Sequence, residues 1–596
     1  MTGRSPGHIN LVDQPAAARI GLKPSKKQAF IKLEGSAKET LEQGRNRLVV
    51  AGVLFAFCFV VLAGRLVGLA ISGTGSAVDV EAGLTPKPAA VAALDKRAPI
   101  YDRSGNLLAV TLDAVSLFAD PRKVLDAEEA AQKLVRVLPE LEQEGLKSKL
   151  SLQRNFVWVK RHLTPHQQKQ VNDLGIPGLF FRTEERRVYP MGHLAAHVVG
   201  YTDIDGNGIA GIEKYFNSRL SGDNPKDAGP VNLSVDMRVQ YALRDELSRY
   251  MSIFRAIGAS GMVLDVKTGE VLGMVSLPDF DPNRPGDFPR ENKFNRVTLG
   301  VYEMGSTFKA FTTAMALDLK SVSLRDGYDA TKPIRIAGFR IRDDHGKKRW
   351  LSVPEIFIYS SNIGTAKMAE DVGPKKHKAF LKKIGLLDRP VIELPEIGAP
   401  ILPPRWNTLE TMTISYGHGL SVSPLQLSTA MGAMVNGGIF RNPTLIHQKD
   451  QTAVEGRRVI RQKTSDVVRK LMRLVVEKGT GGKAEAKGYL VGGKTGTAEK
   501  AVNGRYKRDA LVTSFASAFP MNNPRYVVLA MLDEPKGNES TYGFRSAGWT
   551  TAPIVSRLVT RIAPILGVMP VDEEDPRIQK AMHVPTYSRE KNNETF

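Results

Sequence analysis

The first apolar pattern along the chain lies near its N-terminus. No charged residue occurs from Leu48 to Gly64, and after Arg65 the apolar run continues to Ile71. A run of this length predicts one membrane-spanning helix at residues 48–71. A cleaved signal peptide is the alternative, but its apolar core would span only about 7–15 residues.

Charge on either side of this run predicts its orientation. Residues 1–47 contain nine Lys or Arg against four Asp or Glu, whereas residues 66–90 contain a single Lys. The positive-inside rule therefore predicts a basic cytoplasmic tail at 1–47 and export of the chain beyond about residue 72. The only cysteine, Cys58, lies inside the predicted helix, so the exported part can form no disulfide.

Short apolar runs farther along the chain predict the strands of a sheet. Residues 262–266 and 270–275 flank Lys267-Thr268-Gly269, which is typical of a hairpin turn. Three more runs, at 489–498, 511–519 and 526–532, predict neighbouring strands.

The region between the predicted anchor and these strands has a different pattern, and we assign residues 75–228 to a separate β-rich unit with helices. Residues 120–150 show charged and apolar positions at helical spacing. His193 and His197 have the spacing of a metal-binding pair but no third ligand nearby, which favours a structural role.

Composition and charge narrow the function classes. The chain has 596 residues, is 42% hydrophobic and can bury more than one core. Its formal charge of +21 suggests an anionic partner, but the basic residues are spread along the chain. Without zinc-ligand spacing, an RNP motif or an arginine-rich arm, we read the charge as surface suited to anionic lipid or cell-wall polymer, not to nucleic acid.

The tetrapeptide Ser306-Thr307-Phe308-Lys309 is the strongest chemical signal. A spacing of three residues places the serine hydroxyl and the lysine amine on one helix face. The amine can then take the proton that the serine must lose to attack a carbonyl carbon. The largely apolar residues 310–317 predict that this pair lies at the start of a buried helix.

Two further motifs follow in chain order, Ser360-Ser361-Asn362 and Lys494-Thr495-Gly496-Thr497. Together with the first motif they form the signature of penicillin-binding proteins and class A β-lactamases, with Ser361 in place of the usual Asp. Similar short sequences at Ser588 and Lys591, at Ser104-Gly105-Asn106 and at Lys267-Thr268-Gly269 lack the apolar setting or the chain order.

A rival reading concerns residues 488–495, which match the phosphate-binding loop pattern G-x-x-x-x-G-K-[ST] in full. Such a loop requires a buried strand before its first glycine and a helix beginning at the lysine. The preceding residues 483–487 are polar, and glycines soon after Lys494 leave no room for a helix. We therefore predict a strand here and no ATP binding.

With these motifs in order, the chain resembles the class B penicillin-binding proteins, and among them the FtsI-type septal peptidoglycan D,D-transpeptidases. Tyr302-Glu303-Met304-Gly305 resembles the division branch rather than the elongation branch. The resemblance covers about residues 45–560 and rests on an ordered series of segments: 97–109, 187–213, 233–240, 302–309, 360–362, 417–426 and 493–497.

The resemblance implies an α+β architecture. A single transmembrane helix would precede a β-rich pedestal of the dimerisation type at 75–228. A transpeptidase domain at 229–565 would hold an antiparallel sheet with helices on both faces. Its active site would lie between the sheet edge and a helical lobe. Residues 566–596 would form a disordered tail, which contains an acidic stretch that begins at Asp572.

The resemblance also implies the roles of individual residues. Ser306 would attack the D-Ala-D-Ala bond of a stem pentapeptide, and an amine of an acceptor stem would then take the acyl group. Lys309 would be the base, with its pKa lowered by burial and by Lys494 as a second cation. The other roles are these: Ser360 relays a proton, Asn362 orients Lys309 or the substrate, Lys494, Thr495 and Thr497 hold the terminal carboxylate beside Gly496, and the N–H groups of Ser306 and Thr497 form the oxyanion hole.

No metal or cofactor is expected. The expected partners are peptidoglycan stems, β-lactams as inhibitors, an FtsW-type membrane glycosyltransferase and other divisome proteins, at the septum of the inner membrane with the catalytic domain in the periplasm. The alternatives are an elongation-type class B transpeptidase, a D,D-carboxypeptidase, a β-lactam sensor or β-lactamase-like enzyme, and a scaffold with a vestigial site.

Overall fold

The computed structural model describes residues 49, 52–63, 96–223, 226–448, 454–502, 505–585 and 587. Residues 52–63 are helical, and Cys58 on this helix is exposed. Among the described residues, we find no helix with the length and apolar character that crossing a membrane requires. Much of the predicted anchor and all of the predicted tail at 1–47 lie outside the described residues, so both stay predictions.

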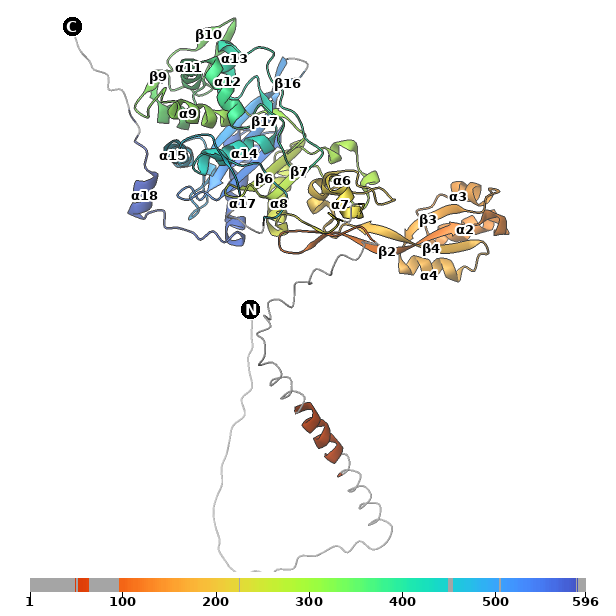
Figure 1. The fold of residues 1–596 in the computed structure, drawn as a ribbon. Coiled ribbons are helices and arrows are strands. Elements are labelled where there is room, and N and C mark those ends of the chain that lie inside the picture. Colours follow the sequence, from red (N-terminus) through yellow and green to blue (C-terminus); the bar gives the residue numbers. More distant parts are fainter. Residues whose placement is uncertain are drawn as a thin grey trace, which may run out of the picture. The chain divides into compact units, whose positions relative to one another are not determined.

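The N-terminal part of the described chain from Lys96 onward is organised around one long strand, β2 (Leu107–Ala119) (Figure 1). Antiparallel neighbours of β2 are β1, β3 and β4, and β1 also pairs in parallel with β5. Three helices bury Leu117, Leu134 and Leu146 against this sheet. The elements are β1 (Ile100–Tyr101), β3 (Val157–Leu163), β4 (Leu179–Val188), β5 (Val231–Asn232), α2 (Ala127–Val137), α3 (Gln143–Leu150) and α4 (Pro165–Asp173).

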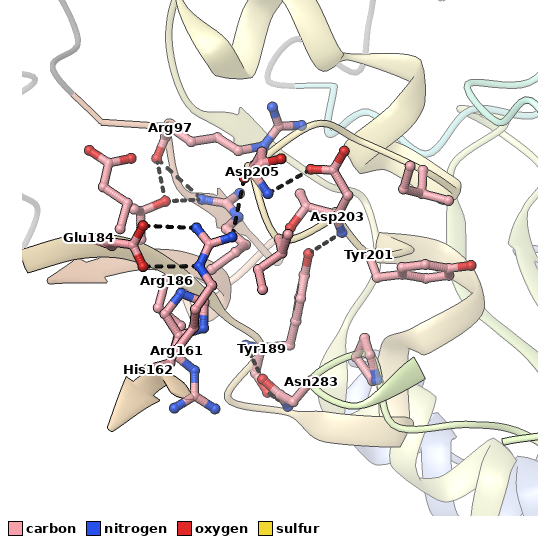
Figure 2. Close-up of a pocket in the computed structure, with 18 of the residues that line it drawn as sticks. Arg97, Arg161, His162, Glu184, Arg186, Tyr189, Tyr201, Asp203, Asp205 and Asn283 are labelled. Atoms are coloured by element: carbon pink, nitrogen blue, oxygen red, sulfur yellow. Dashed lines mark hydrogen bonds and ion pairs between the residues drawn. The ribbon is translucent and has the colours of Figure 1, made fainter. Parts of the chain in front are cut away.

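A buried ion cluster joins the start of this region to α6 (Gly211–Tyr215). The carboxylate of Glu213 is fully buried and accepts from Arg97 Nε and Arg187 Nε, each at 2.7 Å. These arginines border a cavity of about 860 Å³. Figure 2 shows a second ion-pair group in this cavity, where Arg161 bridges Glu184 and Asp205. The cavity contains none of the three sequence motifs.

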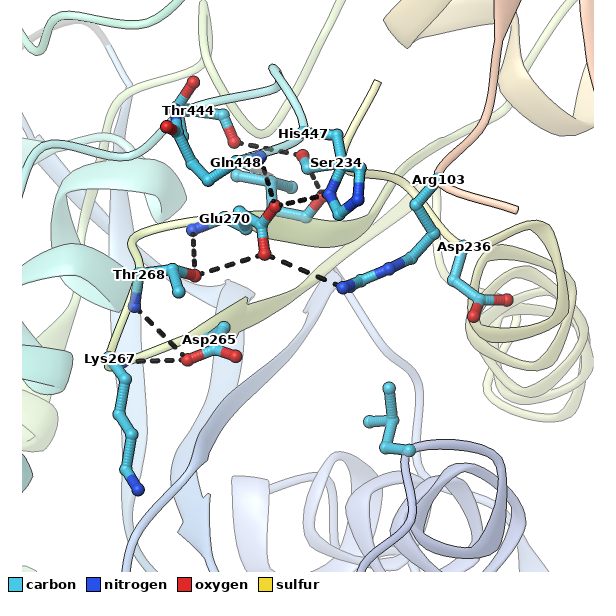
Figure 3. A network of polar contacts seen from close by, with 12 residues as sticks. Arg103, Ser234, Asp236, Asp265, Lys267, Thr268, Glu270, Thr444, His447 and Gln448 are labelled. Atoms are coloured by element: carbon cyan, nitrogen blue, oxygen red, sulfur yellow. Dashed lines mark hydrogen bonds and ion pairs between the residues drawn. The ribbon is translucent and has the colours of Figure 1, made fainter. Parts of the chain in front are cut away.

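A second polar cluster joins the N-terminal region to the larger sheet (Figure 3). Buried Glu270 lies 2.8 Å from His447 Nδ1 and 3.7 Å from Arg103 Nη2. It also accepts from Thr268 Oγ1, in the turn between β6 (Gly258–Asp265) and β7 (Val271–Leu277). These two strands pair antiparallel, which confirms the predicted hairpin at Lys267-Thr268-Gly269.

The larger sheet is antiparallel and five-stranded, in the order β16-β17-β18-β6-β7. Alternate side chains of its strands face two different cores. Met262 and Leu529 pack into one core, whereas Val263 and Phe515 pack into the other. The three strands predicted near the C-terminus are confirmed as β16 (Gly492–Val502), β17 (Arg505–Phe519) and β18 (Tyr526–Asp533).

The predicted start of β16 is wrong by three residues. Residues 489–491 do not join the strand, because Leu490 adopts a positive φ of 43° that extended backbone does not allow. The prediction of a strand at Lys494 in place of a helix is confirmed, since the strand runs through this lysine to Val502.

Helices cover both faces of the sheet, as the family resemblance implied (Figure 1). Helix α8 packs on β6 and β7 and helix α17 on β17 and β18, whereas α14 covers the other face. A helical lobe extends from the face that α14 covers. The helices on the two faces and in the lobe, taken together, are α8 (Met237–Ile253), α9 (Lys309–Asp318), α10 (Val353–Ile358), α11 (Asn362–Val372), α12 (Pro374–Lys383), α13 (Thr408–Ser415), α14 (Pro424–Val435), α15 (Gln462–Lys478), α16 (Ala547–Thr550) and α17 (Ala552–Ile565).

The expectation of a disordered tail at 566–596 is wrong for its first half. Helix α18 (Pro576–Met582) forms there, and Ile578 and Met582 pack against the main core. Glu573, in the acidic stretch that suggested disorder, pairs with Arg473 Nη2 at 3.0 Å. The negative charge of Glu573 is therefore paired with a buried arginine. Residues 588–596 lie outside the described residues.

Candidate active site

Ser306 lies in a short 3-10 turn, Gly305–Phe308, that leads directly into α9. Gly305 adopts φ +53°, and a Cβ added there would lie 2.6 Å from the carbonyl oxygen of Thr497. Only glycine allows the turn to approach the edge strand β16 this closely. The sequence therefore places Ser306 between the sheet edge and the helices.

Lys309 is the centre of the site. Its Nζ lies 2.8 Å from Ser306 Oγ, 3.0 Å from Ser360 Oγ, and 2.6 Å from both the Ser360 carbonyl oxygen and Asn362 Oδ1. The side chain is 1% exposed. The pair predicted from spacing alone is thus in contact, and the second motif adds three oxygen atoms around the same amine.

These contacts fit a neutral amine. Two of the four oxygens, the Ser360 carbonyl and Asn362 Oδ1, can only accept, so they take the two N–H bonds of a neutral Lys309. The lone pair then remains for a hydroxyl proton, and Ser306 O–H is in position to donate it. Burial lowers the pKa of Lys309 to about 7, although Asp343 and Asp344 act in the opposite direction.

Ser360 links the two lysines. It follows α10 with a positive φ of 59° and accepts a hydrogen bond from Lys494 Nζ at 2.9 Å. Lys494 is fully buried on β16, and burial followed by the charge of Lys309 lowers its pKa well below the usual value. Burial is thus the principal cause of the lowered pKa for both lysines, and the expected lowering of the Lys309 pKa by the charge of Lys494 is not among the causes of that shift.

Asp343 is a residue that the sequence reasoning missed. Its carboxylate accepts from Ser361 Oγ at 2.8 Å and from the N–H of Ile363 at 3.0 Å. Ser361 itself caps α11 by accepting from the N–H of Gly364. The unusual middle residue of the motif therefore has a structural task, and no sequence pattern near Asp343 indicated it.

The third motif lies along the edge strand. Thr495 Oγ1 lies 2.7 Å from Thr480 Oγ1. Thr480 is, after Asp343, a second residue near the site that the sequence did not indicate. A Cβ on Gly496 would lie 2.5 Å from the Met304 carbonyl oxygen, so this glycine lets the strand meet the Ser306 turn. Thr497 Oγ1 accepts from the N–H of Ala547 at 3.2 Å.

Of the remaining candidates, those within the described residues do not join this site. Ser588 and Lys591 lie outside the described residues, and Lys267 lies in the hairpin turn of Figure 3. His197 Nε2 lies 2.9 Å from the Asn292 carbonyl oxygen, and burial lowers the pKa of this histidine to about 4. Its packing against Phe280 is that of a core residue.

Comparisons with known proteins agree with this arrangement. Residues 259–556 match the family described as the penicillin-binding protein transpeptidase domain, and residues 93–233 match the penicillin-binding protein dimerisation domain. Over 539 residues the chain is 40% identical to the probable peptidoglycan D,D-transpeptidase FtsI of Caulobacter vibrioides, covering 88% of this chain and 89% of that protein.

Two further similarities extend the comparison. The peptidoglycan D,D-transpeptidase FtsI of Escherichia coli is 30% identical over 505 residues, which are 80% of this chain and 84% of that protein. The crystal structure of penicillin-binding protein 3 from Mycobacterium tuberculosis with aztreonam superposes with a TM-score of 0.62 at 25% identity. It covers 80% of this chain and 97% of that chain.

Proposed function

The chain belongs to the class B penicillin-binding proteins, and we propose that it is a peptidoglycan D,D-transpeptidase that works through an acyl-enzyme on Ser306. One observation carries the proposal. The Lys309 amine lies 2.8 Å from the serine hydroxyl, is buried, and has its pKa lowered to about 7. A nucleophile and a base matched to neutral pH are thus in contact.

In the first step the substrate carbonyl lies at Ser306. The proton of Ser306 moves to Lys309 Nζ while Oγ forms a bond to the carbonyl carbon. The N–H groups of Ser306 and Thr497 stabilise the negative oxygen, and the close approach of Gly305 to Thr497 supports this pairing. The C–N bond to the last D-Ala then breaks, and Ser360 passes a proton to the departing amine.

The third motif would hold the terminal carboxylate of the stem. Lys494, Thr495 and Thr497 supply an ammonium group and two hydroxyls along the edge of β16. Burial disfavours the charge on Lys494 in the free site, and an incoming carboxylate would restore it because opposite charges stabilise each other. Binding of the terminal carboxylate of the stem would thus change the protonation states of Lys309 and Lys494.

In the second step an amine of a neighbouring stem enters where the D-Ala left. It gives a proton back through Ser360 while its nitrogen bonds to the acyl carbon, and the bond to Ser306 Oγ breaks. The products are a cross-linked pair of stems and the free serine. If water took this place instead, the enzyme would be a D,D-carboxypeptidase.

Benzylpenicillin tests the first step. Its strained ring opens onto the serine without releasing a fragment, so we expect a stable adduct on the peptide containing Ser306 by intact-protein and peptide mass spectrometry. The adduct should be absent in Ser306→Ala. Rapid turnover of the drug, or labelling that persists in Ser306→Ala, would contradict the assignment and favour a β-lactamase-like enzyme.

The finer assignments rest on the family resemblance and the sequence pattern. We propose that residues 48–71 anchor the chain in the inner membrane, that the catalytic part is periplasmic, and that it acts at the septum with an FtsW-type glycosyltransferase and other divisome proteins. Protease added to spheroplasts should degrade the chain beyond about residue 75. A fluorescent fusion should mark mid-cell, whereas a side-wall pattern would indicate the elongation type.

A further inference from the structure

One partly buried carboxylate near Ser306 has a histidine, rather than a lysine or an arginine, as its basic neighbour. Glu303 stands three residues before the serine on β8 (Tyr302–Glu303), and its side chain is 15% exposed. Its Oε1 accepts from the N–H of Gly419 at 2.9 Å and from the hydroxyl of Tyr506 at 3.0 Å. Among the described residues, no Lys or Arg pairs with it, and only His418 Nδ1 approaches, at 3.2 Å from Oε2.

Two aromatic rings, those of His418 and Tyr506, contact this carboxylate, and a third, that of Tyr416, packs against His418. Tyr416 lies 5.4 Å from His418, and His418 lies 5.7 Å from Tyr506, with interplanar angles of 55° and 75°. Tyr506 is 49% exposed, so the group opens to solvent. Glu303 contributes, after burial, to raising the pKa of both tyrosines, to about 12 for Tyr416. Its negative charge is therefore felt by the rings.

A carboxylate among aromatic rings suits a cation. The negative faces of aromatic rings attract ammonium groups, and a partly buried carboxylate without a lysine or arginine partner supplies the opposite charge. Glu246, a more deeply buried carboxylate, already has two arginine partners, Arg557 and Arg561. Among the described residues, Glu303 has no such permanently charged partner.

The position of this group defines which part of a substrate it meets. In the proposed mechanism, Lys494 at the start of the third motif on β16 holds the terminal carboxylate of the stem. The Ser306 turn meets β16 farther along, at Gly496 and Thr497, and the Gly305 N–H donates to the Gly417 carbonyl oxygen at 3.2 Å, next to His418 in sequence. Tyr506 pairs with Ala501, four residues beyond Thr497 and therefore roughly 13 Å farther along β16.

An extended stem lying along the edge of β16 would thus run from its terminal carboxylate near Lys494 toward Tyr506. We propose that Glu303, His418, Tyr416 and Tyr506 form a binding site for a primary ammonium group on the side chain of the donor-stem residue that precedes the D-Ala-D-Ala unit. This site rests on the proposed function, because it selects the donor for the same serine.

The test compares two synthetic acyl-Lys-D-Ala-D-Ala peptides, one with a free lysine side-chain amine and one with that amine acetylated. Full-length protein in detergent is acylated by each, and the ratio of the two acylation rate constants is measured. We expect a ratio of about tenfold in favour of the free amine, which corresponds to about 1.4 kcal/mol. In Glu303→Gln, which keeps an oxygen for the Gly419 N–H, the ratio should fall to below about twofold.

Two further variants guard against misfolding as an explanation. Tyr506→Ala, which removes a ring at the exposed rim, should lower the ratio partway. Glu370→Gln, an exposed carboxylate on α11, should keep the full ratio. A ratio near one in the unmodified enzyme, or a full ratio in Glu303→Gln, would overturn the ammonium site.

Benzylpenicillin separates the two possible failures, since its side chain carries no ammonium group. If Ser306 forms the penicillin adduct while the peptide ratio is near one, only the ammonium site is rejected. If neither the peptides nor benzylpenicillin acylate Ser306, the proposed function is rejected together with it.

Discussion

Two clusters of buried charge in this protein are arranged in opposite ways. At the junction in the N-terminal region, two guanidinium groups share the carboxylate of Glu213, at 2.7 Å each. At the catalytic site, Lys309 and Lys494 approach one hydroxyl, that of Ser360, at 3.0 and 2.9 Å. No carboxylate of the described residues pairs with either lysine within 4.0 Å.

The ion cluster around Glu213 stabilises the fold, whereas the lysine pair at the catalytic site supports the reaction. The opposite charges at Glu213 compensate one another for the loss of water, so removing any one of the three groups should destabilise the junction. The lysines have no such compensation, and burial therefore lowers the pKa of both. An amine that is neutral near pH 7 is what proton transfer from Ser306 requires.

The largest effect should come from removing the catalytic amine. Lys309→Ala should slow acylation by benzylpenicillin by about 10⁴-fold, because Ser306 loses the base that takes its proton. Stopped-flow acylation kinetics measure this, and Lys463→Ala, at an exposed position on α15, serves as the control. Acylation at the unmodified rate in Lys309→Ala would mean that another group activates the serine.

The next effect concerns the ion cluster around Glu213. Glu213→Gln leaves two buried guanidinium groups without a counter-charge and should lower the free energy of unfolding by about 3–5 kcal/mol. Urea unfolding measures the loss, with Glu144→Gln on the exposed surface of α3 as the control. Folded Glu213→Gln protein should still be acylated. An unchanged unfolding curve would show that the ion cluster contributes nothing to stability.

The lysine pair should make stability depend on pH. The pKa of Lys309 is about 7 in the folded protein against 10.5 as its ordinary value. Between these values the unfolded chain binds more protons, so stability rises with pH and the cost of burial is complete below about pH 7. From about pH 7.5 to 9, the unfolding free energy of the unmodified protein should rise by about 2 kcal/mol relative to Lys309→Met. Parallel pH curves for the two proteins would disprove a depressed lysine.

The smallest effect should come from an exposed carboxylate. Asp344 raises the pKa of Lys309, so Asp344→Asn should move the rising limb of the acylation rate against pH, centred near 7, toward lower pH. Screening by solvent keeps this shift small. Acylation rates from about pH 5.5 to 8.5 measure it, with Asp173→Asn on α4 as the control. A shift toward higher pH would contradict the assigned sign.

Much of the catalytic cluster could be predicted from local sequence. The spacing of Ser306 and Lys309 within one turn fixes their contact, and glycine-rich punctuation around Lys494 excluded a helix there. The start of β16 and the formation of helix α18 in the tail could not be predicted. Leu490 takes a positive φ, and Glu573 finds Arg473 a hundred residues away, which no local pattern encodes.

The sequence by itself thus determined the nucleophile, its base and the order of the three motifs, because short-range spacing sets which side chains share a turn or a strand. Only the tertiary structure decided what those groups can do. Burial from all sides lowers the pKa of Lys309, the positive φ of Ser360 places its hydroxyl between two lysines, and Asp343 supports Ser361 from outside the motif. Electrostatic environment depends on contacts between segments far apart in the chain, and these exist only after folding.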